Sequence, residues 1–293
     1  AYSALIKKNP RNSDALHLRG VVWSQQGRHT DAIREIKRAI KINYDKAHYH
    51  HNLANVYQHV EQYSEALFHY DESLRLNFAQ PEAYFHRAIC LEKMGRYPEA
   101  LSSLDRASVL GSDSVKIEVK KGNILSVMKE YEKSAKSYEK ALELMEDPQT
   151  AILCGNAAFF NADFTTAIAF YDRSLALDTD NVTALYNRGS ALANAKQLQG
   201  ALQSFDRVIE LEPDNADAHE LRGHVLKEMR SFPEAITSYE RAISLQPDQP
   251  FLLGSLLYTK HQICDWQNLP NNLKKLNQAV ANGERATPGF PYL

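Results

Sequence analysis

The chain has 293 residues, of which 44% are hydrophobic, and a formal net charge of −2 at pH 7. Basic and acidic residues are interspersed, so the sequence has no electrostatic footprint for nucleic acid or for an anionic membrane. It has no apolar run of membrane-spanning length and no signal-peptide pattern, and its three cysteines are widely spaced, as is typical of buried thiols in a reducing cytoplasm.

The first predicted element is the remnant of a helix, in residues 1–12. Tyr2, Leu5, Ile6 and Pro10 fit the second half of a helical hairpin whose first helix is missing. We therefore expect a truncated repeat at the N-terminus.

The next 237 residues form seven units of about 34 residues, each predicted to contain helix A, a short turn, helix B and a connector. The predicted units are 13–46, 47–80, 81–114, 115–147, 148–181, 182–215 and 216–249. Two helix signals support this division. Gly27 and Gly95 stand where helix A should stop, and Pro98 and Pro233 stand in the first turn of helix B.

Four positions within the unit carry the repeat. Position 8 is always small: Gly20, Ala54, Ala88, Gly122, Gly155, Gly189 and Gly223. Position 20 is also small: Ala32, Ala66, Ala100, Ser134, Ala167, Ala201 and Ala235. Position 24 is large: Ile36, Tyr70, Leu104, Tyr138, Tyr171, Phe205 and Tyr239. Position 30 is apolar: Ile42, Leu76, Leu110, Leu144, Leu177, Leu211 and Leu245. We expect the two helices to cross closely at the small positions.

This pattern resembles the tetratricopeptide repeat family over about four-fifths of the chain. The resemblance implies an all-α fold, a right-handed superhelical solenoid of antiparallel helix pairs. It also implies that the A helices line a concave groove that binds protein or peptide partners, with positions 2, 5, 6, 9, 12 and 13 facing it.

Residues 250–282 still have a helical pattern but lose the landmarks, so we expect degenerate capping helices there, followed by a tail, 283–293. The run Ile263-Cys264-Asp265-Trp266, with Phe290, Tyr292 and Leu293 further on, is similar to the junction between repeats and catalytic region in O-linked N-acetylglucosamine transferases. Alternatively, Trp266 only caps the last repeat. The first interpretation implies a downstream catalytic domain that uses UDP-N-acetylglucosamine.

The chain itself is predicted not to be an enzyme and to need no cofactor. It has no glycine-rich phosphate-binding motif, and no histidine between Pro288 and Leu293, where the resemblance would place one. The competing interpretation, from another class of protein, is a non-enzymatic adaptor or co-chaperone.

Groove-facing asparagines are the first set of candidate binding residues. Their side-chain amides both donate and accept hydrogen bonds, which suits recognition of a peptide backbone. The candidates are Asn52, Asn55, Asn123, Asn156 and Asn187, of which Asn52 and Asn187, at position 6, fit best.

A second set has the spacing of a clamp for the C-terminal carboxylates of partner proteins. It consists of His51, Asn55, His86, Lys116 and Lys120. Because two of its members are histidines, such a clamp would weaken as pH rises through neutral. The same region is rich in histidine, but no pair has the HExxH arrangement, and we expect no metal site.

Three further expectations concern packing. Basic residues at position 7 and acids at position 25 of the same unit, such as Arg87 with Asp105 and Arg222 with Glu240, predict ion pairs between the two helices of one hairpin. At least one of Phe159 and Phe160 faces either the groove or a neighbouring repeat. The apolar run from Phe251 to Leu257 is expected to be partly exposed, which would favour self-association.

Overall fold

The structure is a computed structural model and describes residues 2–247, 250–267 and 269–281. That part contains 17 α-helices and no β-strand, which confirms the predicted all-α class. In chain order they are α1 (Tyr2–Lys8), α2 (Ser13–Gln25), α3 (His29–Ile42), α4 (Ala47–His59), α5 (Tyr63–Leu76), α6 (Pro81–Lys93), α7 (Tyr97–Val109), α8 (Ser114–Val127), α9 (Tyr131–Leu144), α10 (Pro148–Phe160), α11 (Phe164–Leu177), α12 (Val182–Asn194), α13 (Leu198–Leu211), α14 (Ala216–Glu228), α15 (Phe232–Leu245), α16 (Pro250–Gln262) and α17 (Leu269–Ala281).

The helices from α2 to α15 form seven consecutive pairs, and the two helices of each pair pack closely against each other. Helix A of each pair begins within one residue of the start of a sequence repeat. Several A helices begin with a side-chain cap, in which Asn12, Asn181 or Asn215 accepts a backbone N–H three residues on. Pro98 and Pro233 lie in the first turn of helix B, as predicted.

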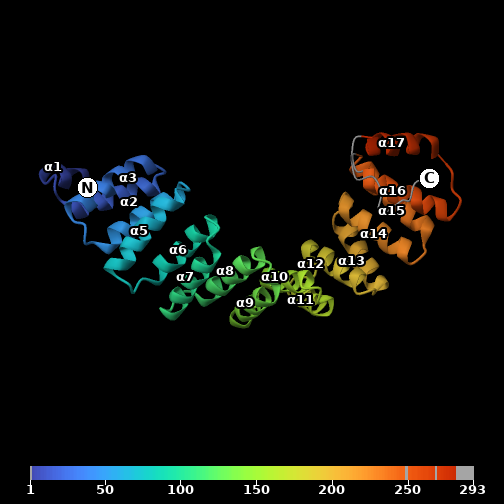
Figure 1. The fold of residues 1–293 in the computed structure, drawn as a ribbon, viewed down its shortest axis with the longest axis horizontal. Helices are drawn as coiled ribbons and strands as arrows, with labels where there is room; N and C mark the ends of the chain where they lie inside the picture. The colour runs from blue at the N-terminus through green and yellow to red at the C-terminus, as the bar shows by residue number, and fades with distance from the viewer. Residues whose placement is uncertain (1, 248–249, 268, 282–293) are drawn as a thin grey trace. The chain divides into compact units, whose positions relative to one another are not determined.

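The chain divides into two compact parts, the N-terminal unit (Ala1–Met145) and the C-terminal unit (Glu146–Leu293). Within each unit, helix B of one pair packs on helix A of the next (Figure 1). The buried residues therefore form cores between neighbouring pairs, as in a solenoid. In the N-terminal unit Ile6 of α1 joins the first of these cores.

The small and large landmarks meet where the two helices of a pair cross. A Cβ atom added to Gly155 would lie 2.5 Å from a ring carbon of Tyr171, and one added to Gly223 would lie 2.6 Å from Tyr239. Both tyrosines are almost completely buried. A glycine hydrogen thus leaves the space that the aromatic ring fills.

The apolar run in α16 is buried on one side, while Phe251 and Leu253 remain partly exposed. Leu252 and Leu256 are buried in a cluster with Tyr239 and Ala242 of α15, and Leu257 is also buried. The three leucines are buried because α16 packs on α15 as helix A of a further pair would. The predicted tail, 283–293, lies outside the described residues.

Candidate functional site

The candidate binding residues lie on the A helices, where position 6 of one repeat lies next to the preceding A helix. In the N-terminal unit Asn52 Nδ2 of α4 lies 2.8 Å from His17 Nε2 of α2. Burial and the neighbouring His48 lower the pKa of His17 to about 4, so the ring is neutral at pH 7 and accepts this N–H. The Oδ1 atom of Asn52 has no protein partner among the described residues.

In the C-terminal unit the same relation joins two of the predicted asparagines. Asn187 Nδ2 of α12 donates to Asn156 Oδ1 of α10 across 2.9 Å. Asn187 Oδ1 and Asn156 Nδ2 have no hydrogen-bond partner in the described part of the protein. An acceptor from one repeat therefore lies beside a donor from the previous repeat.

The side chains at position 9 are held by the buried tyrosines at position 24. The Tyr171 hydroxyl donates to Asn156 Oδ1 across 2.8 Å. Burial raises the pKa of Tyr171 above its ordinary value, so the hydroxyl keeps the proton that it donates. Equivalent bonds join Tyr70 to Asn55 at 2.6 Å, Tyr138 to Asn123 at 2.7 Å and Tyr239 to His224 at 2.8 Å.

These tyrosine bonds were missed by sequence reasoning, although a signal for them was present. Position 9 carries an amide or an imidazole in each repeat that has tyrosine at position 24. Where position 24 is Ile36, Leu104 or Phe205, position 9 is Val21, Ile89 or Ser190. The correlation follows from chemistry, because a buried hydroxyl needs an acceptor.

Both lysines of the predicted carboxylate clamp are paired with acids of the protein. Lys120 of α8 lies 3.0 Å from Glu92 of α6, and Lys116 lies 3.2 Å from Asp113. Burial lowers the pKa of both His51 and His86, with a further lowering of the His51 pKa by His86. Both imidazoles are therefore neutral at pH 7, and the attraction for a carboxylate at this place is weaker than the spacing alone indicates.

A polar pocket of about 360 Å³ brings two of the predicted residues together in the N-terminal unit. Asn55 and His86 line it with Gln58, His59, Glu61 and Tyr63. The His86 ring stacks on Tyr70, with ring centroids 6.2 Å apart, and its Nδ1 atom is buried without a hydrogen-bond partner. This pocket offers amide and imidazole groups to a polar side chain of a ligand.

In the histidine-rich region two imidazole rings interact with each other. His50 Nδ1 and His69 Nδ1 lie 3.1 Å apart, so one ring donates to the other. Among the described residues no group of three or more histidine, cysteine or carboxylate side chains could hold a metal ion. Cys90 and Cys154 are buried, and Cys264 is exposed.

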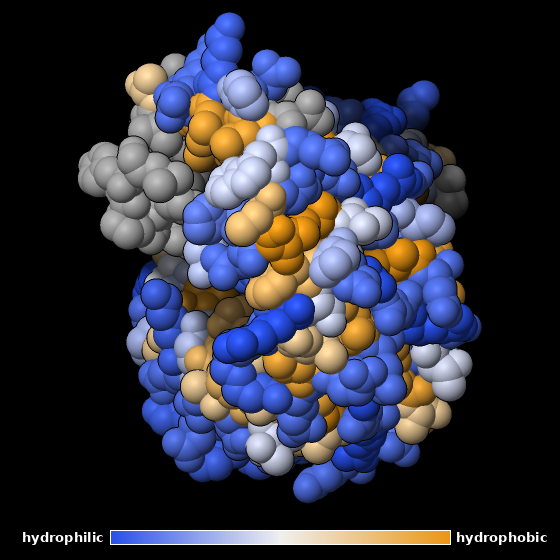
Figure 2. All heavy atoms as spheres, turned by 90° about the vertical axis from the view of Figure 1, so that its right-hand side faces the viewer, coloured by the Kyte–Doolittle hydropathy of each residue, from blue (hydrophilic) through white to orange (hydrophobic). Residues whose placement is uncertain are grey.

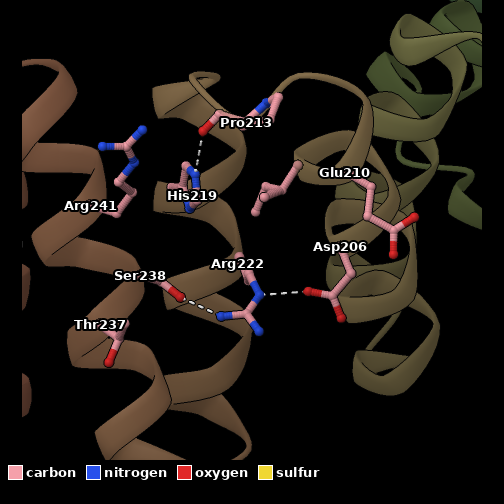
Figure 3. Close-up of a pocket in the computed structure, with 9 residues that line it drawn as sticks. Asp206, Glu210, Pro213, His219, Arg222, Thr237, Ser238 and Arg241 are labelled. Atoms are coloured by element: carbon pink, nitrogen blue, oxygen red, sulfur yellow. Dashed lines mark hydrogen bonds and ion pairs between the residues drawn. The ribbon is translucent and has the colours of Figure 1, made fainter.

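Ion pairs at position 7 join neighbouring repeats, which corrects the prediction that they lie within one hairpin. Arg222 Nε lies 2.6 Å from Asp206 of the preceding repeat, and its Nη1 atom donates to Ser238 of its own helix B (Figure 3). The same connection to the preceding repeat is made by Arg87 with Asp71, Lys121 with Asp105 and Arg188 with Asp172. Each acid belongs to helix B of the preceding repeat, which packs on this helix A.

Phe159 and Phe160 have different surroundings. Phe159 packs against the buried cluster that contains Ile152 and Tyr171, whereas Phe160 at position 13 is 64% exposed. At the end of the chain Trp266 is 50% exposed and lies edge-on to His261. On the face shown in Figure 2, apolar side chains form small patches among hydrophilic ones.

No helix in the described part of the chain combines the length and the apolar composition that crossing a bilayer requires.

Comparison with known families finds models described as tetratricopeptide repeat at residues 1–47, 47–78, 82–107, 119–148, 155–225 and 216–249. A search of the curated proteins finds no match.

Solved structures share the fold. The C-terminal part of a TPR repeat-containing protein from Cytophaga hutchinsonii matches with a TM-score of 0.73 and 14% identity, over 82% of this chain and 99% of that one. A tetratricopeptide repeat protein from Parabacteroides merdae matches with a TM-score of 0.57 and 14% identity, over 84% and 98%. The protein MamA matches with a TM-score of 0.53 and 23% identity, over 55% and 95%.

Proposed function

Since the chain belongs to the tetratricopeptide repeat family, we propose that it is a protein-interaction scaffold whose A helices bind extended segments of partner proteins. The observation that carries this proposal is the orientation of the asparagine amides. Asn55, Asn123 and Asn156 use Oδ1 within the protein, whereas Asn52 and Asn187 use Nδ2. Position 9 thus offers N–H donors and position 6 offers C=O acceptors.

An extended peptide exposes the complementary groups, because each of its residues carries one N–H and one C=O whatever the side chain is. Recognition of this kind accepts many sequences. The scaffold would therefore present varied protein segments, with the exposed Phe160 and the pocket around Asn55 adding contacts to side chains.

The test is direct binding of peptides. A displayed library of unstructured segments is selected on the full chain, and the affinity of a selected peptide is measured by fluorescence polarisation. We expect the double variant Asn156→Ala, Asn187→Ala, or Asn52→Ala for peptides bound by the N-terminal unit, to weaken binding about tenfold, because each change removes hydrogen bonds from a partly buried site.

The matched control is Gln203→Ala, which removes an exposed amide from helix B and should leave affinity unchanged. Unchanged affinity in all asparagine variants would contradict backbone recognition. Loss of binding only in Lys116→Ala, Lys120→Ala would instead favour the carboxylate-clamp adaptor.

We also propose that the parent protein is a glycosyltransferase of the O-linked N-acetylglucosamine transferase type, with this chain as its substrate-recognition region. The support is the run Ile263 to Trp266, which directly follows the first helix after the last repeat. The coding sequence beyond Leu293 tests this. A nucleotide-sugar-binding region and transfer of N-acetylglucosamine by the longer protein are expected, and a stop codon or a further repeat would contradict the proposal.

A further inference from the structure

A second kind of pocket recurs at the same repeat positions in both units. In the C-terminal unit it has about 640 Å³ and lies between α13, α14 and α15 (Figure 3). In the N-terminal unit it has about 410 Å³ and is lined by Asp71, Leu74, Arg75, Tyr84, Arg87, Ser102, Ser103 and Arg106. Apart from Pro213, the lining residues of both pockets come from positions 25, 28 and 29 of one repeat and 4, 7, 22, 23 and 26 of the next, none of which is a groove position.

In three repeats of the C-terminal unit, the arginine at position 26 of the repeat pairs with an acidic residue. The acid stands two residues before helix A of the same repeat, in the connector. Arg241 pairs with Asp214 at 2.6 Å, Arg207 with Asp180 at 2.7 Å and Arg173 with Glu146 at 3.0 Å. Three repeats of the C-terminal unit thus fill this position with a carboxylate.

The pocket of the N-terminal unit lacks that carboxylate. Ala79 stands at the place of Asp214, two residues before α6. The guanidinium of Arg106 has no ion pair with any residue in the described ranges, whereas Arg87 pairs with Asp71 and Arg75 pairs with Glu72. The positive charge of Arg106 is therefore left uncompensated in a pocket that contains two further guanidinium groups.

We propose that this pocket binds an acidic side chain of a partner protein. The partner's carboxylate would pair with Arg106, as Asp214 pairs with Arg241, because Ala79 supplies no carboxylate there. The repeats of the C-terminal unit supply the precedent, since the same arginine position binds an Asp or Glu carboxylate there. Tyr84 and the exposed Ser102 add hydroxyl groups at its edge. None of its lining residues occupies a groove position, so this pocket would hold a second partner or a second segment of the same one.

The experiment follows the Nε–Hε resonances of the arginines in the full chain by NMR while a blocked peptide, acetyl-Gly-Gly-Glu-Glu-Gly-Gly-amide, is added at constant ionic strength. We expect a saturable change at Arg106 with this peptide and none with its glutamine analogue. Ala79→Asp should abolish the change by supplying the missing acid, and Ala79→Asn, which has the same size without the charge, should preserve it.

Two further variants test whether the arginine at position 26 binds the carboxylate. Arg106→Gln should weaken peptide binding at least tenfold, and Asp214→Ala should produce a new saturable change at Arg241, because it removes the carboxylate that pairs with this arginine in the equivalent pocket. Equal responses in wild type and Ala79→Asp, or to the glutamine peptide, would overturn the proposal. Saturation by inorganic phosphate without any response to the acidic peptide would also overturn it, in favour of a phosphate group.

Discussion

At the scale of single residues, close helix crossing depends on what stands at position 8. Gly155, Gly189 and Gly223 each leave space for the aromatic ring at position 24 of the same repeat. The ring fills the hairpin and, where it is a tyrosine, directs its hydroxyl to position 9. A change at position 8 should therefore disturb both packing and the orientation of a binding residue.

Gly155→Ala should destabilise the C-terminal unit by about 2 kcal/mol, because the added methyl group would overlap the Tyr171 ring. The shift of the midpoint in urea unfolding, followed by circular dichroism, measures this. Gly200→Ala is the matched control. Its methyl group would meet only the flexible end of Leu192, at 3.3 Å, so it should be neutral or slightly stabilising. Equal effects of the two changes would refute the packing explanation.

At the scale of the element, the turn between helix A and helix B has one conformation in all seven repeats. The residue at position 15 has positive φ in each: Gly27, Glu61, Gly95, Lys129, Ala162, Lys196 and Arg230. Glycine adopts this conformation without strain, but only two repeats use it. The other five therefore contain a strained turn that packing of the hairpin imposes.

Replacing Ala162, whose φ is 60°, by glycine should stabilise the C-terminal unit by about 1 kcal/mol. The reason is that the side-chain strain of the left-handed conformation disappears. Urea unfolding again provides the measurement. Ala195→Gly at a φ of −75° is the comparison and should destabilise by a similar amount, since it only adds freedom to the unfolded chain. A loss of stability in Ala162→Gly would show that the turn is not strained.

At the scale of the whole molecule, the two units differ in their histidines. Eight of the 11 histidines lie between His17 and His86, in the N-terminal unit. Burial lowers the pKa of His17 and of His69 to about 4, and it also lowers the pKa of His50. Burial lowers the pKa of His51 and His86 as well, and all five of these histidines lie in the N-terminal unit.

The N-terminal unit should therefore lose stability in acid before the C-terminal unit does. Between about pH 6.5 and pH 4 the unfolded state binds protons that the folded His17 and His69 do not, so stability falls as pH decreases through this window. Hydrogen exchange at pH 7 and pH 5, corrected for intrinsic rates, should show reduced protection in α2, α4 and α5 and little change in α12 to α14.

The variant His69→Gln should reduce this pH dependence, and His219→Gln in the C-terminal unit should not. Uniform loss of protection along the described helices would contradict the role of the buried histidines.

The helical pairs could be predicted from the sequence, because in a repeat protein the landmarks of packing recur at constant spacing and their contacts are local. The sequence also identified asparagines on the A helices. The contacts between groups of neighbouring repeats could not be predicted in this way and required the packed helices. Arg87 is 16 residues from Asp71 and 18 from Asp105, and α6 packs against both α5 and α7, so only the three-dimensional arrangement of these helices shows that Asp71 is its partner. The orientation of each amide and the absence of an ion pair at Arg106 among the described residues likewise depend on distances between helices, which the spacing of residues in the sequence does not give.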